Sequence, residues 1–164
     1  MKNQTLLNGL YAGVLFFFWK MTVLALDKQH EWLPTFPGLP LLLLVGIFVF
    51  ISITRYTEKG SSLPDDFKAG ARTALVAAIT GGFFVFAYYS WFDPEFMPVR
   101  IQINMDAARA LGEISEEDLQ KAEEQMRQFY SPFAYSTLTV SGTAFFGMAF
   151  ALIVSGLKRA FRVL

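Results

Sequence analysis

The sequence predicts an all-α fold, an integral membrane four-helix bundle, and three observations carry this prediction. Of the 164 residues, 54% are hydrophobic and only 17% charged, well under the roughly 25% of soluble domains. The apolar residues gather in four blocks. The length of each block approaches or exceeds that of a membrane-spanning helix, about 20 residues. The blocks are too long and too uniformly apolar for alternating barrel strands. We therefore expect a single membrane domain over residues 1–164.

The four spans are expected at residues 6–26, 37–56, 69–92 and 133–157. The first block loosely resembles a signal peptide, but Lys20 interrupts it and its length favours a retained anchor. The second block reaches spanning length by including Pro37 and Arg55–Tyr56 at its ends. It has Gly46 among bulky neighbours, so we expect it at the periphery of the bundle.

Lysine and arginine residues predict the orientation of the chain. The decisive basic residues lie between Arg55 and Arg72 and again between Lys158 and Arg162. Since basic residues near span ends stay in the cytoplasm, both termini are expected to be cytoplasmic. Residues 27–38 and 93–132 are then expected outside.

The composition leaves little room for catalytic chemistry. The chain has no cysteine, one histidine (His30) and a formal net charge of zero, which argues against disulfides, zinc sites and nucleic-acid binding. No catalytic, cofactor-binding or metal-binding residue is predicted, and no cofactor. A membrane enzyme acting on lipid-type substrates would have to use Asp93, Glu95 and His30, and stays a minor alternative.

Small residues at four-residue spacing predict seams for helix packing, because helices in a bilayer associate through close backbone contact. The seams comprise Gly9 and Gly13 in the first span, Gly70, Ala74, Ala78 and Gly82 in the third, and Thr143, Gly147, Ala151 and Ser155 in the fourth. They either hold one bundle together or leave one seam for a partner or a second copy.

The segment 93–132 is predicted to hold an amphipathic extracytoplasmic helix. Ser115 is a plausible N-cap with acidic residues after it, and the apolar stripe consists of Leu119, Ala122, Met126 and Phe129. A second helix is expected around residues 101–111. The stripe either rests on the outer end of the bundle or forms a docking surface for a periplasmic or membrane partner.

Lys20 and Asp93 form the candidate intramembrane polar site. A lysine inside a span is costly, and its long stem can reach outward to the headgroups. Alternatively, Lys20 faces the bundle and pairs with Asp93 or Asp27. The aromatic residues Tyr88, Tyr89, Trp91 and Phe92, like Trp32, are expected in an interfacial belt.

An ordered set of short motifs covers nearly the whole chain. The set comprises Gly9 and Gly13, Arg55–Tyr56, Phe67–Gly70, Asp93–Phe96, Gly112 with Ser115–Glu117, and Lys158–Arg159. Through these motifs, the chain resembles the uncharacterised bacterial membrane-protein family catalogued as domain of unknown function 4199. The resemblance implies four spans and a bacterial inner membrane, and it implies no activity.

Abundant packing signals with almost no catalytic signal favour a non-enzymatic accessory or assembly subunit. The alternative is a small transporter or channel-like oligomer with Lys20 near its path. The expected partners are the lipid bilayer and a membrane or periplasmic protein or a second copy, but no nucleic acid.

Overall fold

The computed structural model describes residues 2–28, 38–55, 57, 60–112 and 115–161. The described residues are almost entirely helical and contain no strand. The four long helices are α1 (Lys2–Ala25), α3 (Gly38–Arg55), α4 (Leu63–Ala87) and α7 (Pro132–Ala160), and a π-helix, η1 (Tyr88–Phe92), extends α4. Each of the four is long and apolar enough to cross a membrane. The predicted all-α fold is thereby confirmed for the described residues, with four helices that could span a membrane.

Helix α4 begins six residues before the predicted span. The Ser62 hydroxyl accepts a hydrogen bond from the Asp65 amide, Pro64 lies in the first turn, and Asp65 and Asp66 follow. A capping serine, an early proline and acidic first-turn residues all favour a helix start. Hydropathy alone placed the start at residue 69 because this first turn is polar. The earlier start places Asp66 within the packed helices.

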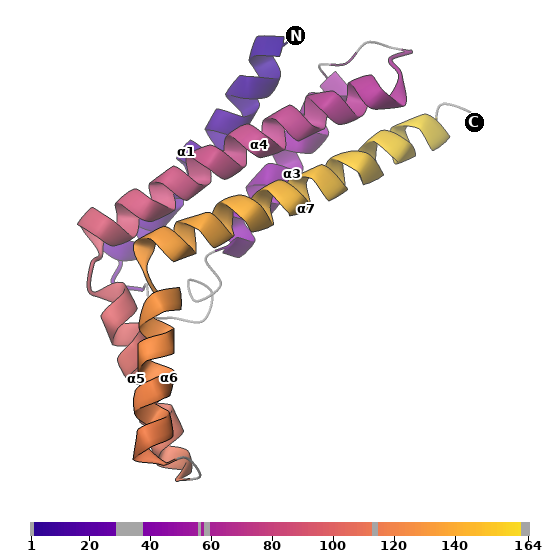
Figure 1. Ribbon diagram of the computed structural model, residues 1–164. Coiled ribbons are helices and arrows are strands. Elements are labelled where there is room, and N and C mark those ends of the chain that lie inside the picture. The colour runs from indigo at the N-terminus through magenta and orange to yellow at the C-terminus, as the bar shows by residue number, and fades with distance from the viewer. Residues whose placement is uncertain (1, 29–37, 56, 58–59, 113–114, 162–164) are drawn as a thin grey trace.

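The other three long helices, α1, α3 and α7, pack against α4 (Figure 1). The start of α1 and the end of α7 lie at the same end of the molecule, which we call the terminal end. The opposite end, where α4 continues into η1, is called the hairpin end.

Helix α3 contacts each of the other three long helices. Its Leu41, Val45, Val49 and Ile53 side chains are fully buried. A Cβ atom added to Gly70 would lie 2.8 Å from the Ile53 side chain, and one added to Gly81 would lie 2.8 Å from Leu41. The bulky side chains of α3 therefore fit where its partners are small, which a search for small residues on α3 itself could not detect.

Helices α5 (Phe96–Leu111) and α6 (Glu116–Phe129) form a hairpin that projects from the hairpin end (Figure 1). Gly112 ends α5 in the left-handed conformation, with φ of 68°, and Ser115 caps α6 by accepting from the Asp118 amide. A left-handed C-terminal residue favours glycine, so the end of α5 at Gly112 follows from the sequence.

The hairpin has a small core of its own. Ile101, Met105 and Leu119 are buried together, with Met126 and Tyr130 packed against them. The stripe of α6 thus lies on α5 and not on the end of the four long helices, because α5 supplies a matching apolar face. Phe129, the last member of the predicted stripe, stays 66% exposed.

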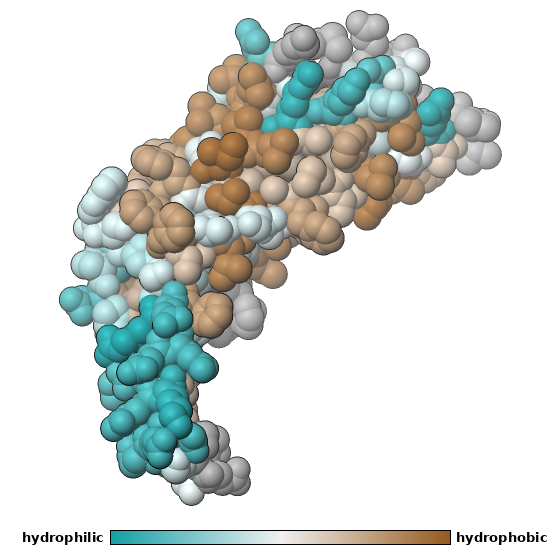
Figure 2. All heavy atoms as spheres, in the orientation of Figure 1, coloured by the Kyte–Doolittle hydropathy of each residue, from teal (hydrophilic) through white to brown (hydrophobic). Residues whose placement is uncertain are grey.

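The hydropathy of the surface also differs between the long helices and the hairpin. In Figure 2, hydrophobic residues cover the long helices, whereas hydrophilic residues cover the hairpin and gather again at the terminal end. An apolar surface between two polar ends is expected of a chain that crosses a lipid bilayer.

Candidate functional site

Lys20 lies inside the protein near the hairpin end. Its side chain is 1% exposed, and its ammonium donates a hydrogen bond to the Tyr89 hydroxyl at 3.0 Å. The expectation that Lys20 extends outward to the headgroups is wrong. As in the alternative, Lys20 faces the other helices, but the partner of its hydrogen bond is Tyr89 and not Asp93 or Asp27. The Tyr89 hydroxyl and the faces of the surrounding aromatic rings contact the ammonium group, which water would contact if the side chain extended to the headgroups.

Aromatic rings surround the Lys20 ammonium on several sides. Its nitrogen lies 4.3 Å from the centre of the Tyr88 ring, 4.8 Å from that of Tyr89, 5.6 Å from that of Phe96 and 6.0 Å from that of Trp19. The faces of aromatic rings attract cations within about 6 Å, and more strongly where water is excluded. These contacts give a buried cation a favourable environment.

Asp93 joins this cluster through a tyrosine. The Tyr88 hydroxyl donates to the Asp93 carboxylate at 3.1 Å, and Asp93 is 9% exposed. The Asp93 amide also donates to the Tyr88 carbonyl at 2.9 Å, five residues back. In an α-helix, residues five apart point about 140° away from each other, whereas the wider turn of a π-helix, with its i→i+5 bonding, brings them nearer to the same side. The π-helix therefore brings Asp93 beneath Tyr88.

The predicted aromatic belt is only partly present among the described residues. Tyr88 and Tyr89 are 0% and 1% exposed, so their assignment to an interfacial belt is wrong. Trp91 and Phe92 are exposed at 68% and 46%. The two tyrosines face inward because they contact Lys20, which sequence spacing alone did not reveal.

The other polar candidates are exposed or fall outside the described residues. Glu95 is exposed at the start of α5, and Asp27 is exposed after α1. His30 and Trp32 fall outside the described residues.

The small residues of the first span face α4. A Cβ atom added to Gly9 would lie 2.5 Å from the Thr73 carbonyl oxygen, and one added to Gly13 would lie 2.6 Å from the Thr80 side chain. Two helix backbones can approach this closely only where one of them lacks a side chain.

The small residues of the third and fourth spans lie between α4, α7 and α3. A Cβ added to Gly147 would lie 2.5 Å from that of Ala74, one added to Gly70 would lie 2.6 Å from that of Ala151, and one added to Gly82 would meet Val140. Ala78, Thr143 and Ser155 are buried as well.

A chain of buried hydrogen bonds, which we did not predict, joins three helices. The Asn8 amide donates to the Ser52 hydroxyl at 2.8 Å, and the hydroxyls of Ser52 and Thr73 lie 2.7 Å apart. Thr73 in turn donates to the Thr5 carbonyl at 2.9 Å. Buried polar groups need partners, and these residues satisfy one another across α1, α3 and α4.

A buried ion pair at the terminal end was also missed. The Lys158 ammonium lies 2.7 Å from the Asp66 carboxylate, and it donates to the Ile53 carbonyl and the Thr57 hydroxyl. The side chains are 12% and 4% exposed, respectively. The signal was present in the sequence, since Ser62 and Pro64 mark a helix start that includes Asp66.

The described residues contain no group of three histidine, cysteine, aspartate or glutamate side chains that could hold a metal ion. The arrangement around Lys20 can bind and fix a positive charge, and it couples that charge to Asp93 through a phenol. It leaves the lysine without access to solvent.

Four apolar helices with buried polar contacts between them define a multi-pass membrane protein. The family model described as "Protein of unknown function (DUF4199)" matches residues 7–159, and the chain belongs to this family. No curated protein and no solved structure matches the chain.

Proposed function

We propose that this protein is a non-enzymatic accessory or assembly subunit of the bacterial inner membrane. In this proposal the four long helices form a bundle in the bilayer, with both termini in the cytoplasm. The α5–α6 hairpin then stands outside as an amphipathic contact element for a membrane or periplasmic protein. The basic residues at the terminal end support this orientation, because short cytoplasmic segments are rich in lysine and arginine.

The closed environment of Lys20 is the observation that carries the proposal. Lys20 of α1 contacts Tyr89 of η1 and Phe96 at the start of α5, and Tyr89 stacks edge-on against Tyr135 of α7. These contacts fix the base of the hairpin to the long helices. A rigid base suits an element that presents a binding surface, since less conformational freedom is lost on binding.

The alternative is a small transporter or channel-like oligomer with Lys20 near its path. An ionisable residue within a membrane helix is commonly functional, and Lys20 is coupled to Asp93. Its 1% exposure argues against contact with a transported species. If Lys20→Met abolished a transport activity while the protein stayed folded, the alternative would replace our proposal.

A pull-down of tagged protein from native membranes in mild detergent tests the proposed function. We expect a second protein at stoichiometric recovery, identified by mass spectrometry. The double variant Glu124→Arg/Gln128→Arg changes the exposed side of α6 and should lose this protein. Ala107→Arg, which places an arginine at an exposed position of α5, is the control and should retain it. Recovery of the chain alone, or only with copies of itself, would contradict the proposal.

A further inference from the structure

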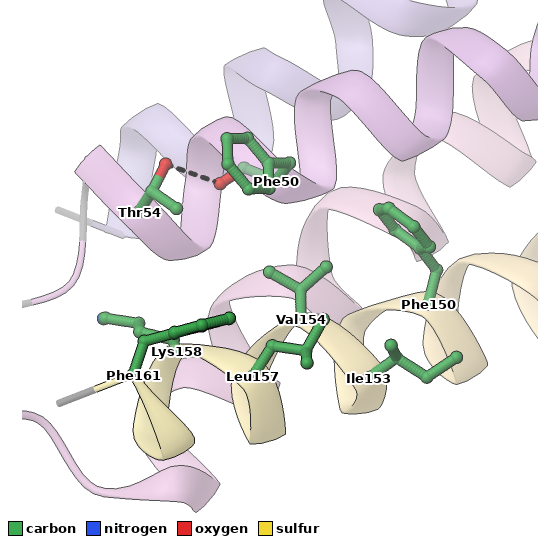
Figure 3. A pocket seen from close by; sticks show the side chains of 8 residues that line it. All are labelled: Phe50, Thr54, Phe150, Ile153, Val154, Leu157, Lys158 and Phe161. Carbon is green, nitrogen blue, oxygen red and sulfur yellow. Dashed lines mark hydrogen bonds between the residues drawn. The ribbon is translucent and has the colours of Figure 1, made fainter. Parts of the chain in front are cut away.

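The surface of the long helices is apolar between the terminal end and the hairpin end. On α7 the exposed side chains include Leu138 and Phe145. A groove between α3 and α7 is lined mainly by apolar side chains as well, among them Phe50 and Phe150 (Figure 3). The Thr54 hydroxyl in this groove already donates to the Phe50 carbonyl at 2.8 Å. A large apolar surface of this kind is typical of contact with a membrane.

Two large aromatic side chains lie exposed where the hairpin joins α7. Phe129, the last residue of α6, is 66% exposed, and Phe133, in the first turn of α7, is 72% exposed. Among the described residues, neither ring packs into the core of the long helices or into that of the hairpin. Both rings are therefore available for contact with a molecule outside the chain.

The length of α7 places Phe133 at the level of the lipid headgroups. Arg159 is exposed at the terminal end, and a rise of 1.5 Å per residue gives about 39 Å along the helix between it and Phe133. The hydrocarbon core of a bilayer is about 30 Å thick, and the bilayer with its headgroups about 40–45 Å. A helix with Arg159 among the headgroups on one side therefore has Phe133 among the headgroups on the other.

Phe129 lies four residues before Phe133, on the other side of a sharp change of direction. Ser131 has an extended backbone and separates α6 from α7, and the hairpin turns away from the direction of the long helices (Figure 1). Because α6 leaves α7 sideways, its last residue stays near the level of Phe133. Trp91 in η1, at the same end, is also exposed, and aromatic side chains are enriched at the interface between membrane and water.

We propose that Phe129 and Phe133 insert into the headgroup region of the bilayer and hold the base of the hairpin at the membrane surface. Lipid is the occupant that the arrangement favours, because the two rings continue the apolar surface of α7 beyond the hydrocarbon core. Aromatic side chains anchor helices that lie in this region. The inference depends on the membrane location, and it is independent of the orientation of the chain and of any protein partner of the hairpin.

Spin labels on single cysteines test this proposal, because the chain has no cysteine of its own. The full chain is labelled at Phe129→Cys or Phe133→Cys and reconstituted into phosphatidylcholine vesicles. The rate at which each label collides with oxygen, which concentrates in lipid, is divided by its collision rate with a water-soluble nickel chelate. We expect a ratio severalfold above that of Glu124→Cys and below that of Leu138→Cys within the span. Glu124 is the matched control, because it is exposed and points about 140° away from Phe129 on α6.

A second pair of variants tests whether the two rings hold the hairpin in place. With the label kept at Gln128→Cys, the double variant Phe129→Ser/Phe133→Ser should raise the collision rate with the nickel chelate, because the base of the hairpin leaves the lipid. Ile103→Ser removes an exposed apolar side chain two turns into α5 and should leave this rate unchanged. All of these positions are exposed, so the changes do not disturb a core.

Three outcomes would overturn the proposal. A ratio at Phe129 equal to that at Glu124 would show that the base of the hairpin stands clear of the lipid. Low collision rates with both reagents, rising when the protein is diluted in lipid, would make the two rings a contact between copies of this chain. A ratio typical of water at Leu138 would remove the membrane location itself. Since the vesicles hold no other protein, these results do not depend on the outcome of the pull-down.

Discussion

The Lys20 ammonium lies 4.3 Å from the centre of the Tyr88 ring, and the hydroxyl of the same tyrosine donates to Asp93 at 3.1 Å. One phenol therefore stands between a buried cation and a buried carboxylate. The ring face attracts the cation and the hydroxyl stabilises the anion. The two charges compensate each other through this side chain, at the place where the hairpin leaves the long helices.

This arrangement predicts energetic coupling between Lys20 and Asp93. Residues that share one polar network show coupling energies of about 0.5–3 kcal/mol in double-mutant cycles. The combination of Lys20→Met and Asp93→Asn should thus cost less stability than the sum of the two single changes. Thermal unfolding of the four proteins in the same detergent measures this difference.

Tyr88→Phe provides the control for that cycle, because it keeps the ring and removes the hydroxyl that reaches Asp93. In the Tyr88→Phe background the coupling should fall. Additive effects in the wild-type background would show that Lys20 and Asp93 act independently.

The sequence predicted the helical class and the four spans because these depend on long apolar blocks. It also predicted the cap at Ser115, which depends on a local side-chain preference. The placement of α3 could not be predicted in this way. Its buried Leu41 and Ile53 side chains meet glycines of α4, and such complementarity exists only between two sequence segments.

The cluster of Lys20, Tyr88, Tyr89 and Asp93 could not be predicted, for a related reason. Tyr88 and Tyr89 belong to an aromatic run that is typical of an interfacial belt. A regular α-helix would not bring Asp93 to the side of Tyr88. The π-helix at Tyr88–Phe92 changes that register, and nothing local in the residues signals it. Asp66 was missed because its helix turn is polar.

Glycine substitutions test the close approach of α1 and α4. Alanine usually stabilises a helix by about 0.5–1 kcal/mol relative to glycine. At Gly9 the added Cβ would lie 2.5 Å from the Thr73 carbonyl oxygen, so Gly9→Ala should instead destabilise the protein by about 1–3 kcal/mol. Gly142→Ala is the matched control, since nothing lies within 4 Å of its added Cβ. A Gly9→Ala protein that melts at or above the wild-type temperature would contradict this packing.

The buried ion pair predicts that Asp66→Asn is strongly destabilising. Removal of one partner leaves the other charge uncompensated, which costs about 3–5 kcal/mol in a protein interior. We expect the lower part of this range, because Lys158 is 12% exposed and can turn toward water. Asp65→Asn, at an exposed neighbouring position, should have a much smaller effect. Equal melting temperatures of the two variants would argue against a stabilising role of the pair.

The hairpin core predicts the effect of Met126→Glu. Met126 packs against Ile101, Met105 and Leu119 between α5 and α6, and a buried carboxylate without a partner is unfavourable. The two helices should separate, so protease should cleave the hairpin faster while the long helices stay protected in the membrane. Gln125→Glu adds the same charge at an exposed neighbouring position and should leave the cleavage rate unchanged. If both variants were cleaved at the wild-type rate, the contact between α5 and α6 would not hold the hairpin together, and its fold would have to depend on another surface.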